Sequence, residues 1–319
     1  QEQGIGLFNG YLISMGKRAP IFDTYCFVDW SASSKPSPAK PSADAIWVGV
    51  KSGRSPATAH YFRTRLEAFA FLHAAFSHFI QSGRRVLAGF DFPLAYSHPL
   101  LREPGVPFWE STWNAFYRQI TDDDSNANNR FDVASAINSQ LELNSPGPFW
   151  GCTAGRETAH LRKTSPSFPI ARGKAIIQRL RLSEQALPGT QEAWKLLGIG
   201  SAGSQTLLGI PYLQKLRMEF KNQMHVWPME TGFASNPCKG TSIVIVEAWP
   251  GIIHKKVSQQ LQANPEQIRD QVQVLQLCAW AKAQDLAGKL SDYFEKPGSL
   301  NKTEVERCLE LEGWILGAK

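Results

Sequence analysis

Short apolar runs and longer stretches of helical spacing follow one another along the chain, and this order predicts an α/β protein. Runs rich in β-branched and aromatic residues predict strands. Apolar residues spaced three and four apart over 64–82 predict a helix, with Thr64 as its N-cap. The strands are expected at 24–30, 45–51, 58–64, 84–91 and 242–247.

The part of the chain between the fourth and fifth expected strands has a different pattern. Residues 107–145 and 203–220 have helical spacing, and 146–183 is rich in Pro, Gly, Arg and Lys. After the fifth strand, helices are expected at 265–290 and 301–316.

These patterns predict one α/β core interrupted by a large insertion. The core is expected to comprise residues 20–100 and 241–319. Residues 101–240 are expected to form a mostly helical, partly basic insertion between the fourth and fifth strands of a mixed sheet flanked by helices.

Composition narrows the class of protein. The chain has 319 residues, of which 43% are apolar, enough for a sizeable core. It has no apolar run of about 18 residues, so no membrane span or membrane partner is expected. The first residues lack the basic start and apolar stretch of a signal peptide, so none is expected.

Cysteine usage predicts a reducing compartment. Five cysteines are scattered along the chain, odd in number and without CxxC spacing. We therefore expect neither a disulfide framework nor a zinc site, and a cytoplasmic location.

Three of the expected strands end on an acidic residue. Asp29, Asp91 and Glu247 each follow directly on an apolar run. Strand ends are where α/β sheets place their active groups, and an acid from the following helix would complete a cluster of four. Clustered carboxylates repel one another unless a cation neutralises them, and oxygen ligands suit Mg²⁺ or Mn²⁺. Each acid also has a structural alternative, as a turn former or, near a helix start, a partner of the helix dipole.

Several short motifs carry a resemblance to a known family. They lie in this order over roughly residues 25–285: "VDWSA", "GFDFPLAY", "GPFWG", "GSQTLLGIPYLQKLR", "VWPMETGF", "IVEAWPG" and "RDQVQVLQLCAWA". They resemble the domain of unknown function 429 family, regarded as nucleases of ribonuclease H-like fold. Three strands, a helix and a fourth strand also resemble the opening of that fold.

The resemblance implies four site acids, which are Asp29, Asp91, Glu247 and Asp270. Gln271 stands where the family has a small residue after the helix acid. Asp285 and Asp292 therefore remain alternatives to Asp270 for the acid of the late helix.

A basic segment at 151–182 predicts contact with phosphates. The chain has a net charge of +6, and Glu157 is the sole acid in this segment. A solvated basic loop is the alternative. The candidate nucleic-acid contacts are Arg156, Arg162, Lys163, Arg172 and Lys174, with Arg156 also expected to reach the active site.

Together these features predict metal-dependent phosphodiester hydrolysis on nucleic acid. One alternative is a nucleotide-binding or phosphotransfer protein of actin-like type, which requires a second similar domain. Another is a non-catalytic binding protein that retains the fold. The distance between the carboxyl groups of Asp29 and Asp91 discriminates between the enzyme and the non-catalytic binding protein, because a shared cation requires both groups within its reach. The Gly-rich stretch 198–206 lacks the Lys-Ser/Thr ending of a P-loop and is expected to start a helix, where an anion can bind.

Overall fold

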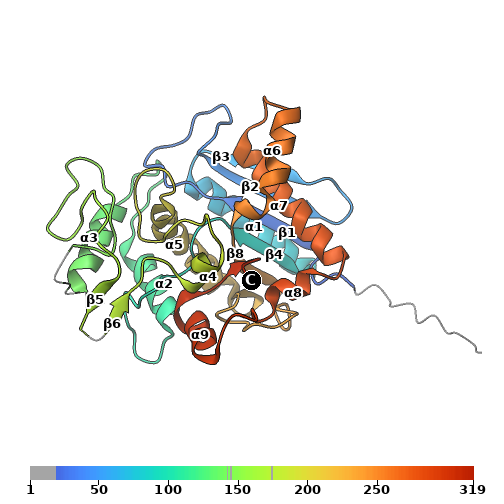
Figure 1. Cartoon of the computed structure of the whole chain (residues 1–319). Helices are drawn as coiled ribbons and strands as arrows, with labels where there is room; N and C mark the ends of the chain where they lie inside the picture. Colours follow the sequence, from blue (N-terminus) through green and yellow to red (C-terminus); the bar gives the residue numbers. More distant parts are fainter. Residues whose placement is uncertain (1–18, 142, 144–145, 174) are drawn as a thin grey trace, which may run out of the picture.

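A central sheet flanked by helices organises the molecule (Figure 1). The computed structural model describes residues 19–141, 143, 146–173 and 175–319. Seven strands form one mixed sheet, and a separate pair forms a small hairpin. The expected α/β class, with a mixed sheet between helices, is confirmed.

The sheet has the strand order β3-β2-β1-β4-β8-β7. β9 also pairs with β8, further along that strand than β7 does. β1, β2 and β3 form an antiparallel meander, whereas β1, β4, β8, β7 and β9 are mutually parallel. The strands are β1 (Thr24–Asp29), β2 (Ile46–Ser52), β3 (Thr58–Phe62), β4 (Val86–Phe90), β7 (Met224–Val226), β8 (Ile243–Ala248) and β9 (Ile315–Leu316), with β5 (Ile170–Arg172) and β6 (Ala175–Ile177) forming the hairpin.

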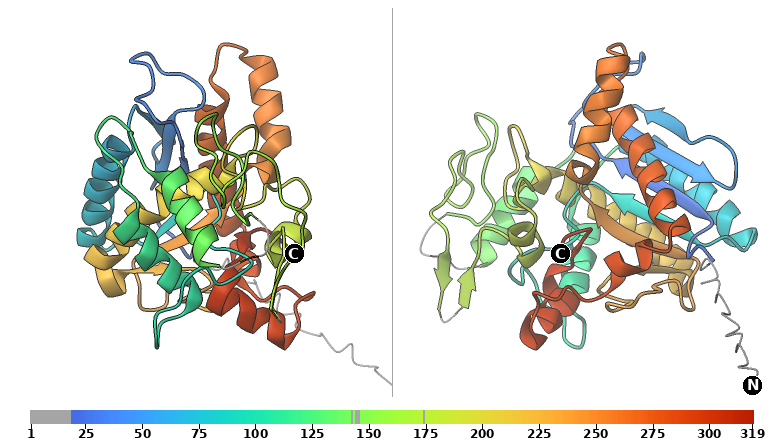
Figure 2. Two further views of the ribbon diagram at one scale, coloured as in Figure 1. Left: turned by 90° about the vertical axis from the view of Figure 1, so that its left-hand side faces the viewer. Right: turned by 45° about the vertical axis from the view of Figure 1, so that its right-hand side comes forward.

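Helices cover both faces of this sheet (Figure 2). Buried side chains of α1, α2, α3 and α5 belong to the core on one face, and those of α6, α7 and α8 belong to the core on the other. The helices are α1 (Arg65–Gln81), α2 (Phe108–Gln119), α3 (Arg130–Gln140), α4 (Leu182–Ala186), α5 (Ala202–Phe220), α6 (His254–Ala263), α7 (Arg269–Leu286), α8 (Leu290–Phe294) and α9 (Lys302–Arg307), with 3₁₀ turns η1 (Lys221–Gln223) and η2 (Pro250–Ile253) and a π-helical turn η3 (Cys308–Glu312).

Strand β1 shows why its sequence belongs in the middle of this sheet. Cys26 and Val28 point into one core, and Tyr25 and Phe27 point into the other. Side chains alternate between faces along a strand, so a strand covered on both sides must be apolar throughout. Gly49 of β2 lets α7 pack closely, because a Cβ there would lie 2.7 Å from a carbonyl oxygen of the helix.

Residues 101–240 contribute more to the sheet than a helical insertion would. Strand β7 comes from this part of the chain and pairs with β8. Buried side chains of α2 and α5 share one hydrophobic core with β1 and β4. The packing therefore joins this segment to the sheet, and its treatment as a distinct unit stays a prediction.

The C-terminal segment differs from its expected helix. Helix α9 continues into η3, and the chain then turns at Gly313, whose φ of +64° favours glycine, before forming β9. Trp314 and Ile315 are buried there, so tertiary packing outweighs the helical spacing of the sequence.

The cysteines and the helices relate to two expectations, that the chain has no disulfide framework and no membrane span. All five cysteines are buried and unbridged. Among the helices of the described residues, none combines the length and apolar character needed to cross a membrane.

Candidate functional site

The first two strand-end acids meet at one edge of the sheet. β1 and β4 are parallel neighbours with Val28 opposite Phe90, so Asp29 and Asp91 both emerge where the two strands end. Their carboxyl groups lie within hydrogen-bonding reach of each other. The backbone N–H of Trp30 donates to Asp91 Oδ1 at 2.8 Å. The approach expected of a shared site is therefore present in this pair.

Burial makes this pair a weak acid, and the charges of nearby carboxylates add to the effect. Burial, followed by the charge of Asp91, raises the pKa of Asp29 well above its ordinary value. Burial raises the pKa of Asp91 to about 7, against the opposing effect of the Trp30 N–H. Near neutral pH the pair consequently shares a proton, because ionising both carboxyls would place two negative charges together in a poorly solvated place.

Asp270 lies close enough to affect this pair. It stands in the first turn of α7, where its Oδ2 accepts the backbone N–H of Asp44 at 2.8 Å. Burial, followed by the opposing effect of that N–H and then the charge of Asp44, leaves the pKa of Asp270 raised. The charge of Asp270 in turn raises the pKa of both Asp29 and Asp91. Asp44 has φ +56°, a left-handed conformation that Asp tolerates better than most residues.

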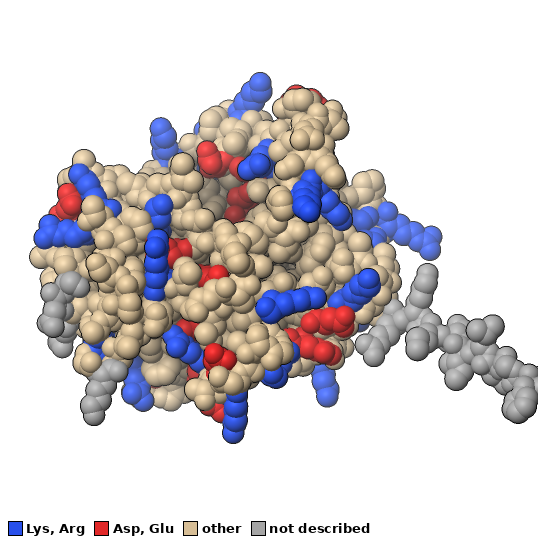
Figure 3. All heavy atoms as spheres, viewed as in Figure 1, with Lys and Arg blue, Asp and Glu red and all other residues tan. Residues whose placement is uncertain are grey.

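These acids open onto a cleft of about 640 Å³, a volume typical of small-molecule sites. Figure 3 shows a recess in the upper centre of this face with acidic side chains inside it. The cleft, called the acid cleft below, is lined by Asp29, Asp44, Asp270, residues 30–34, Arg130, residues 196–201, Ser204 and Gln205.

Asp91 faces a second, smaller cavity of about 100 Å³. Gly200 and Gln205 line both spaces, so the two are neighbours. Within the described ranges, no three His, Cys, Asp or Glu side chains are grouped closely enough to enclose a metal ion. The site is thus a contacting pair of carboxyls with further acids at longer range.

Glu247 has a different environment from the pair. Arg181 donates two hydrogen bonds to it, to Oε2 at 2.7 Å and to Oε1 at 2.5 Å. The backbone N–H of Leu94 also donates to Oε2 at 3.1 Å. Both carboxylate oxygens of Glu247 are therefore occupied by protein donors. Glu247 lines the smaller cavity with Asp91 but not the acid cleft.

The structure also separates the three alternatives for the late-helix acid. Asp285 accepts hydrogen bonds from the backbone N–H groups of Ile21 and Phe22 at 2.8 and 2.9 Å, and from the Tyr25 hydroxyl at 2.7 Å. It lies near the start of β1, at the opposite end from Asp29. Asp292 is exposed. Asp270 is the one that joins Asp29.

Three of the candidate nucleic-acid contacts are engaged by other side chains of the protein. Arg156 pairs with Asp132 at 3.1 Å, and Lys163 pairs with Glu157 at 3.5 Å. Arg172 Nη1 donates to His98 Nε2 at 3.5 Å. Lys174 lies outside the described residues. Their role in binding nucleic acid stays a prediction.

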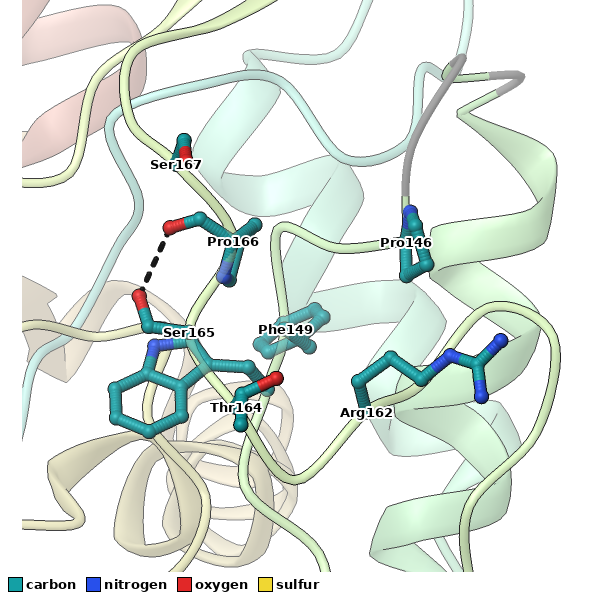
Figure 4. Close-up of a pocket in the computed structure, with 8 residues that line it drawn as sticks. Pro146, Phe149, Arg162, Thr164, Ser165, Pro166 and Ser167 are labelled. Carbon is teal, nitrogen blue, oxygen red and sulfur yellow. Dashed lines mark hydrogen bonds between the residues drawn. The ribbon is translucent and has the colours of Figure 1, made fainter.

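Arg162 borders a separate cavity of about 290 Å³ (Figure 4). Phe149 and Pro146 contribute to its wall. The Ser165 hydroxyl donates to the Pro166 carbonyl at 3.0 Å on another side. In Figure 4 the Arg162 guanidinium extends away from Ser165 and Pro166, so it lies at the margin of this cavity.

Sequence reasoning missed two buried arginines beside the acid cleft. Arg65 is fully buried, and Arg130 is 6% exposed. The sequence contains a signal that both arginines are buried, because each stands at the first position of a helical stripe of apolar residues. Arg130 precedes buried residues three, four and seven positions later, and Arg65 has the same spacing. A cation on the buried face of a helix indicates a partner inside the protein.

Comparisons with known proteins add no assignment to this geometry. No family model, curated protein or solved structure matches the chain.

Proposed function

We propose that this protein is a metal-dependent phosphodiesterase acting on nucleic acid, with a fold of ribonuclease H-like type. The contact between Asp29 and Asp91 carries the proposal. The fold proposal is supported by the antiparallel meander β1–β2–β3, the helix α1 and the parallel strand β4 beside β1. The likeness of the motifs to the domain of unknown function 429 family is consistent with it.

The residues at the sheet edge fit a magnesium or manganese ion. Mg²⁺ is often held by one or two carboxylates, with waters and substrate phosphate oxygens completing its ligands. Asp29 and Asp91 supply that pair, and burial together with nearby negative charge raises the pKa of both, a cost of ionisation that a divalent cation offsets. Asp270 adds negative charge to the same place. A bound ion of this kind supplies activation of water and stabilisation of charge on a phosphoryl group.

The protein groups have separate tasks in this proposal. Asp29 and Asp91 hold the cation, and protons compete with it for these carboxyls, so binding should strengthen as the pH rises through the Asp91 pKa of about 7. The Trp30 N–H fixes the orientation of Asp91. The Asp44 N–H fixes Asp270 at the start of α7. The acid cleft gives a substrate access to Asp29.

The alternatives are less well supported. An actin-like phosphotransfer protein requires two domains of the same design, and the described part of the chain forms a single large sheet. A binding protein without catalysis gives no reason for two partly buried carboxyls so close together, since leaving them unneutralised costs stability.

The test combines metal binding and cleavage. Mn²⁺ should raise the melting temperature of the parent, because a ligand bound by the native state alone stabilises it. The parent should also cleave single- or double-stranded DNA or RNA in Mn²⁺. Asp29→Asn should abolish both effects.

Asp124→Asn is the matched control, because Asp124 is exposed and lies outside the acid cleft. It should respond to Mn²⁺ as the parent does. An equal response in Asp29→Asn would remove Asp29 from the site. A parent that shows a metal response but no cleavage in the full substrate screen would favour the binding protein.

A further inference from the structure

Arg130 is a buried cation in the wall of the acid cleft. Its Nε donates to Ser204 Oγ at 2.9 Å, and its Nη1 donates to Ser34 Oγ and Asn128 Oδ1, both at 2.8 Å. All three acceptors are neutral. Its guanidinium lies 4.4 Å from the ring centre of Phe131, which holds it by stacking. Arg130 makes no ion pair with any carboxylate in the described ranges.

Nearby carboxylate charge compensates Arg130 only in part. Arg65 pairs with Asp122 through two hydrogen bonds of 2.5 and 2.6 Å, and the Tyr212 hydroxyl also donates to Asp122. Asp122 is the one carboxylate that counteracts the lowering of the Arg130 pKa. Burial, followed by the charges of Arg65 and Arg156, leaves that pKa at about 10, so Arg130 is still charged at neutral pH.

One guanidinium nitrogen of Arg130 remains available. Nη2 makes no hydrogen bond to a described residue, yet it is not among the fully buried polar atoms that lack a partner. It therefore has accessible surface, and Arg130 lines the acid cleft. An arginine held rigidly by neutral groups, with a free donor at a cleft, has the arrangement that recognises phosphate oxygens.

The start of α5 adds positive potential to the same cleft. Residues 198–201 and Ser204 line it, and α5 is 19 residues long. Its first turn contains no acidic residue, and Ser201 makes no side-chain capping bond. The N–H groups of Gly203 and Ser204 are bonded to the carbonyls of Lys195 and Ser201, so the helix contributes mainly its dipole.

We propose that Arg130 and the start of α5 form a phosphate-binding subsite of the acid cleft. Its ligand is a phosphate group of the substrate, which enters a cleft whose other charged lining groups are the acids Asp29, Asp44 and Asp270. The assignment of that phosphate to a substrate rests on the proposed function, whereas the anion site itself does not. The subsite makes Arg130 a binding residue and gives the basic side of the cleft a role that the acids cannot fill.

The test uses inorganic phosphate as the probe, in EDTA and against KCl at equal ionic strength. Ser34→Asp places a carboxylate beside Arg130 Nη1 without removing the arginine, and Ser34 is exposed, so folding should be preserved. Ser34→Ala is its uncharged control. Binding, measured by calorimetry, should be similar in the parent and Ser34→Ala and weaker by about tenfold or more in Ser34→Asp.

Arg130→Met should lose phosphate binding as well, with the exposed Arg54→Met as its control. Absence of phosphate binding by the parent, or equal affinity in Ser34→Asp and Ser34→Ala, would overturn the subsite. The comparison of Ser34→Asp with Ser34→Ala tests the phosphate-binding subsite even if Arg130→Met fails to fold.

Two further arms identify the source of the phosphate and separate this proposal from the previous one. A short single-stranded oligonucleotide that binds more tightly than a nucleoside monophosphate assigns the subsite to a nucleic-acid backbone, and the reverse order assigns it to a free nucleotide. Asp29→Asn should keep its phosphate affinity in EDTA. Failure of the metal-dependent reaction therefore appears in the Mn²⁺ assays, and failure of the subsite appears in phosphate binding alone.

Discussion

Asp91 and Glu247 occupy comparable positions at the ends of neighbouring parallel strands, but their surroundings differ. Glu247 is neutralised by Arg181, which also pairs with Glu184 through its Nε at 2.8 Å. Burial by itself would lower the pKa of Arg181, but the charges of Glu184 and Glu247 outweigh it and raise that pKa. Asp91 instead lies beside another carboxyl group, and the pKa values of both are raised.

The difference separates a structural carboxylate from a candidate functional one. A buried ion pair with all its oxygens bonded can be kept for folding, because removing either partner exposes an unpaired charge. Two acids in contact lower stability unless a proton or cation neutralises them. Strands that end alike in sequence therefore place their acids in different surroundings, and substitutions at the two places should have opposite effects.

The largest effect is expected from Arg181→Met. This change leaves Glu247 and Glu184 buried without their cation and should reduce the free energy of unfolding by about 3–5 kcal/mol. Urea unfolding measures it. Arg156→Met, which breaks an exposed pair with Asp132, should cost about 0–1 kcal/mol. Similar losses of unfolding free energy in the two variants would contradict the comparison, because burial of an ion pair would then not increase the cost of removing its cation.

Asp285→Asn should have an intermediate effect. Asp285 is buried like Glu247 but is satisfied by three neutral donors. The amide of an asparagine would direct its own N–H donors at one or more of these three donors. The expected loss of unfolding free energy is about 1–3 kcal/mol. The exposed Asp292→Asn should be nearly neutral in the same urea experiment. A neutral Asp285→Asn would show that buried carboxylates at this sheet tolerate loss of charge whatever their partners.

Asp91→Asn should be neutral or stabilising in EDTA at pH 8, by about 0–2 kcal/mol. An asparagine can keep the bond from the Trp30 N–H and can donate to Asp29, while one repelling charge disappears. The same variant should be inactive in any phosphodiester assay that the parent passes. A clear loss of stability in EDTA would place Asp91 with Glu247 as a structural acid, and retained cleavage would end its catalytic assignment.

The pH dependence of stability should give the smallest and most specific signal. Folding raises the pKa of Asp91 from about 3.9 in the unfolded chain to about 7. Between those values the native state holds a proton that the unfolded chain has released. The resulting stabilisation is complete below about pH 4 and is lost as the pH rises through about 7.

Asp91→Asn lacks this proton. Its free energy of unfolding relative to the parent should therefore increase from pH 5 to pH 8, by at most about 1.4 kcal/mol per pH unit. Urea unfolding at several pH values in EDTA measures the difference. Parallel pH profiles for the two proteins would contradict a proton shared between Asp29 and Asp91.

Several elements of the fold follow from local sequence. The apolar strands β1, β4 and β8 and the capped helix α1 were expected where they occur, because periodicity and capping act over a few residues. Strand β7 was missed, since three residues are too few for a periodic signal. The expected final helix was wrong beyond residue 312, because Trp314 and Ile315 bury their side chains beside β8.

The sequence by itself determined that acids stand at the ends of three apolar strands, since position along a strand is a local property. It did not determine their partners. Whether a carboxyl meets Arg181, another carboxyl or backbone N–H groups depends on segments 61 to 264 residues away in the chain. Only the tertiary structure decided that Glu247 is neutralised by Arg181, that Asp29 and Asp91 have no such cation, and that Arg130 lines the same cleft as Asp29. The physical reason is that charge and burial depend on neighbours in space, which the order of residues does not reveal.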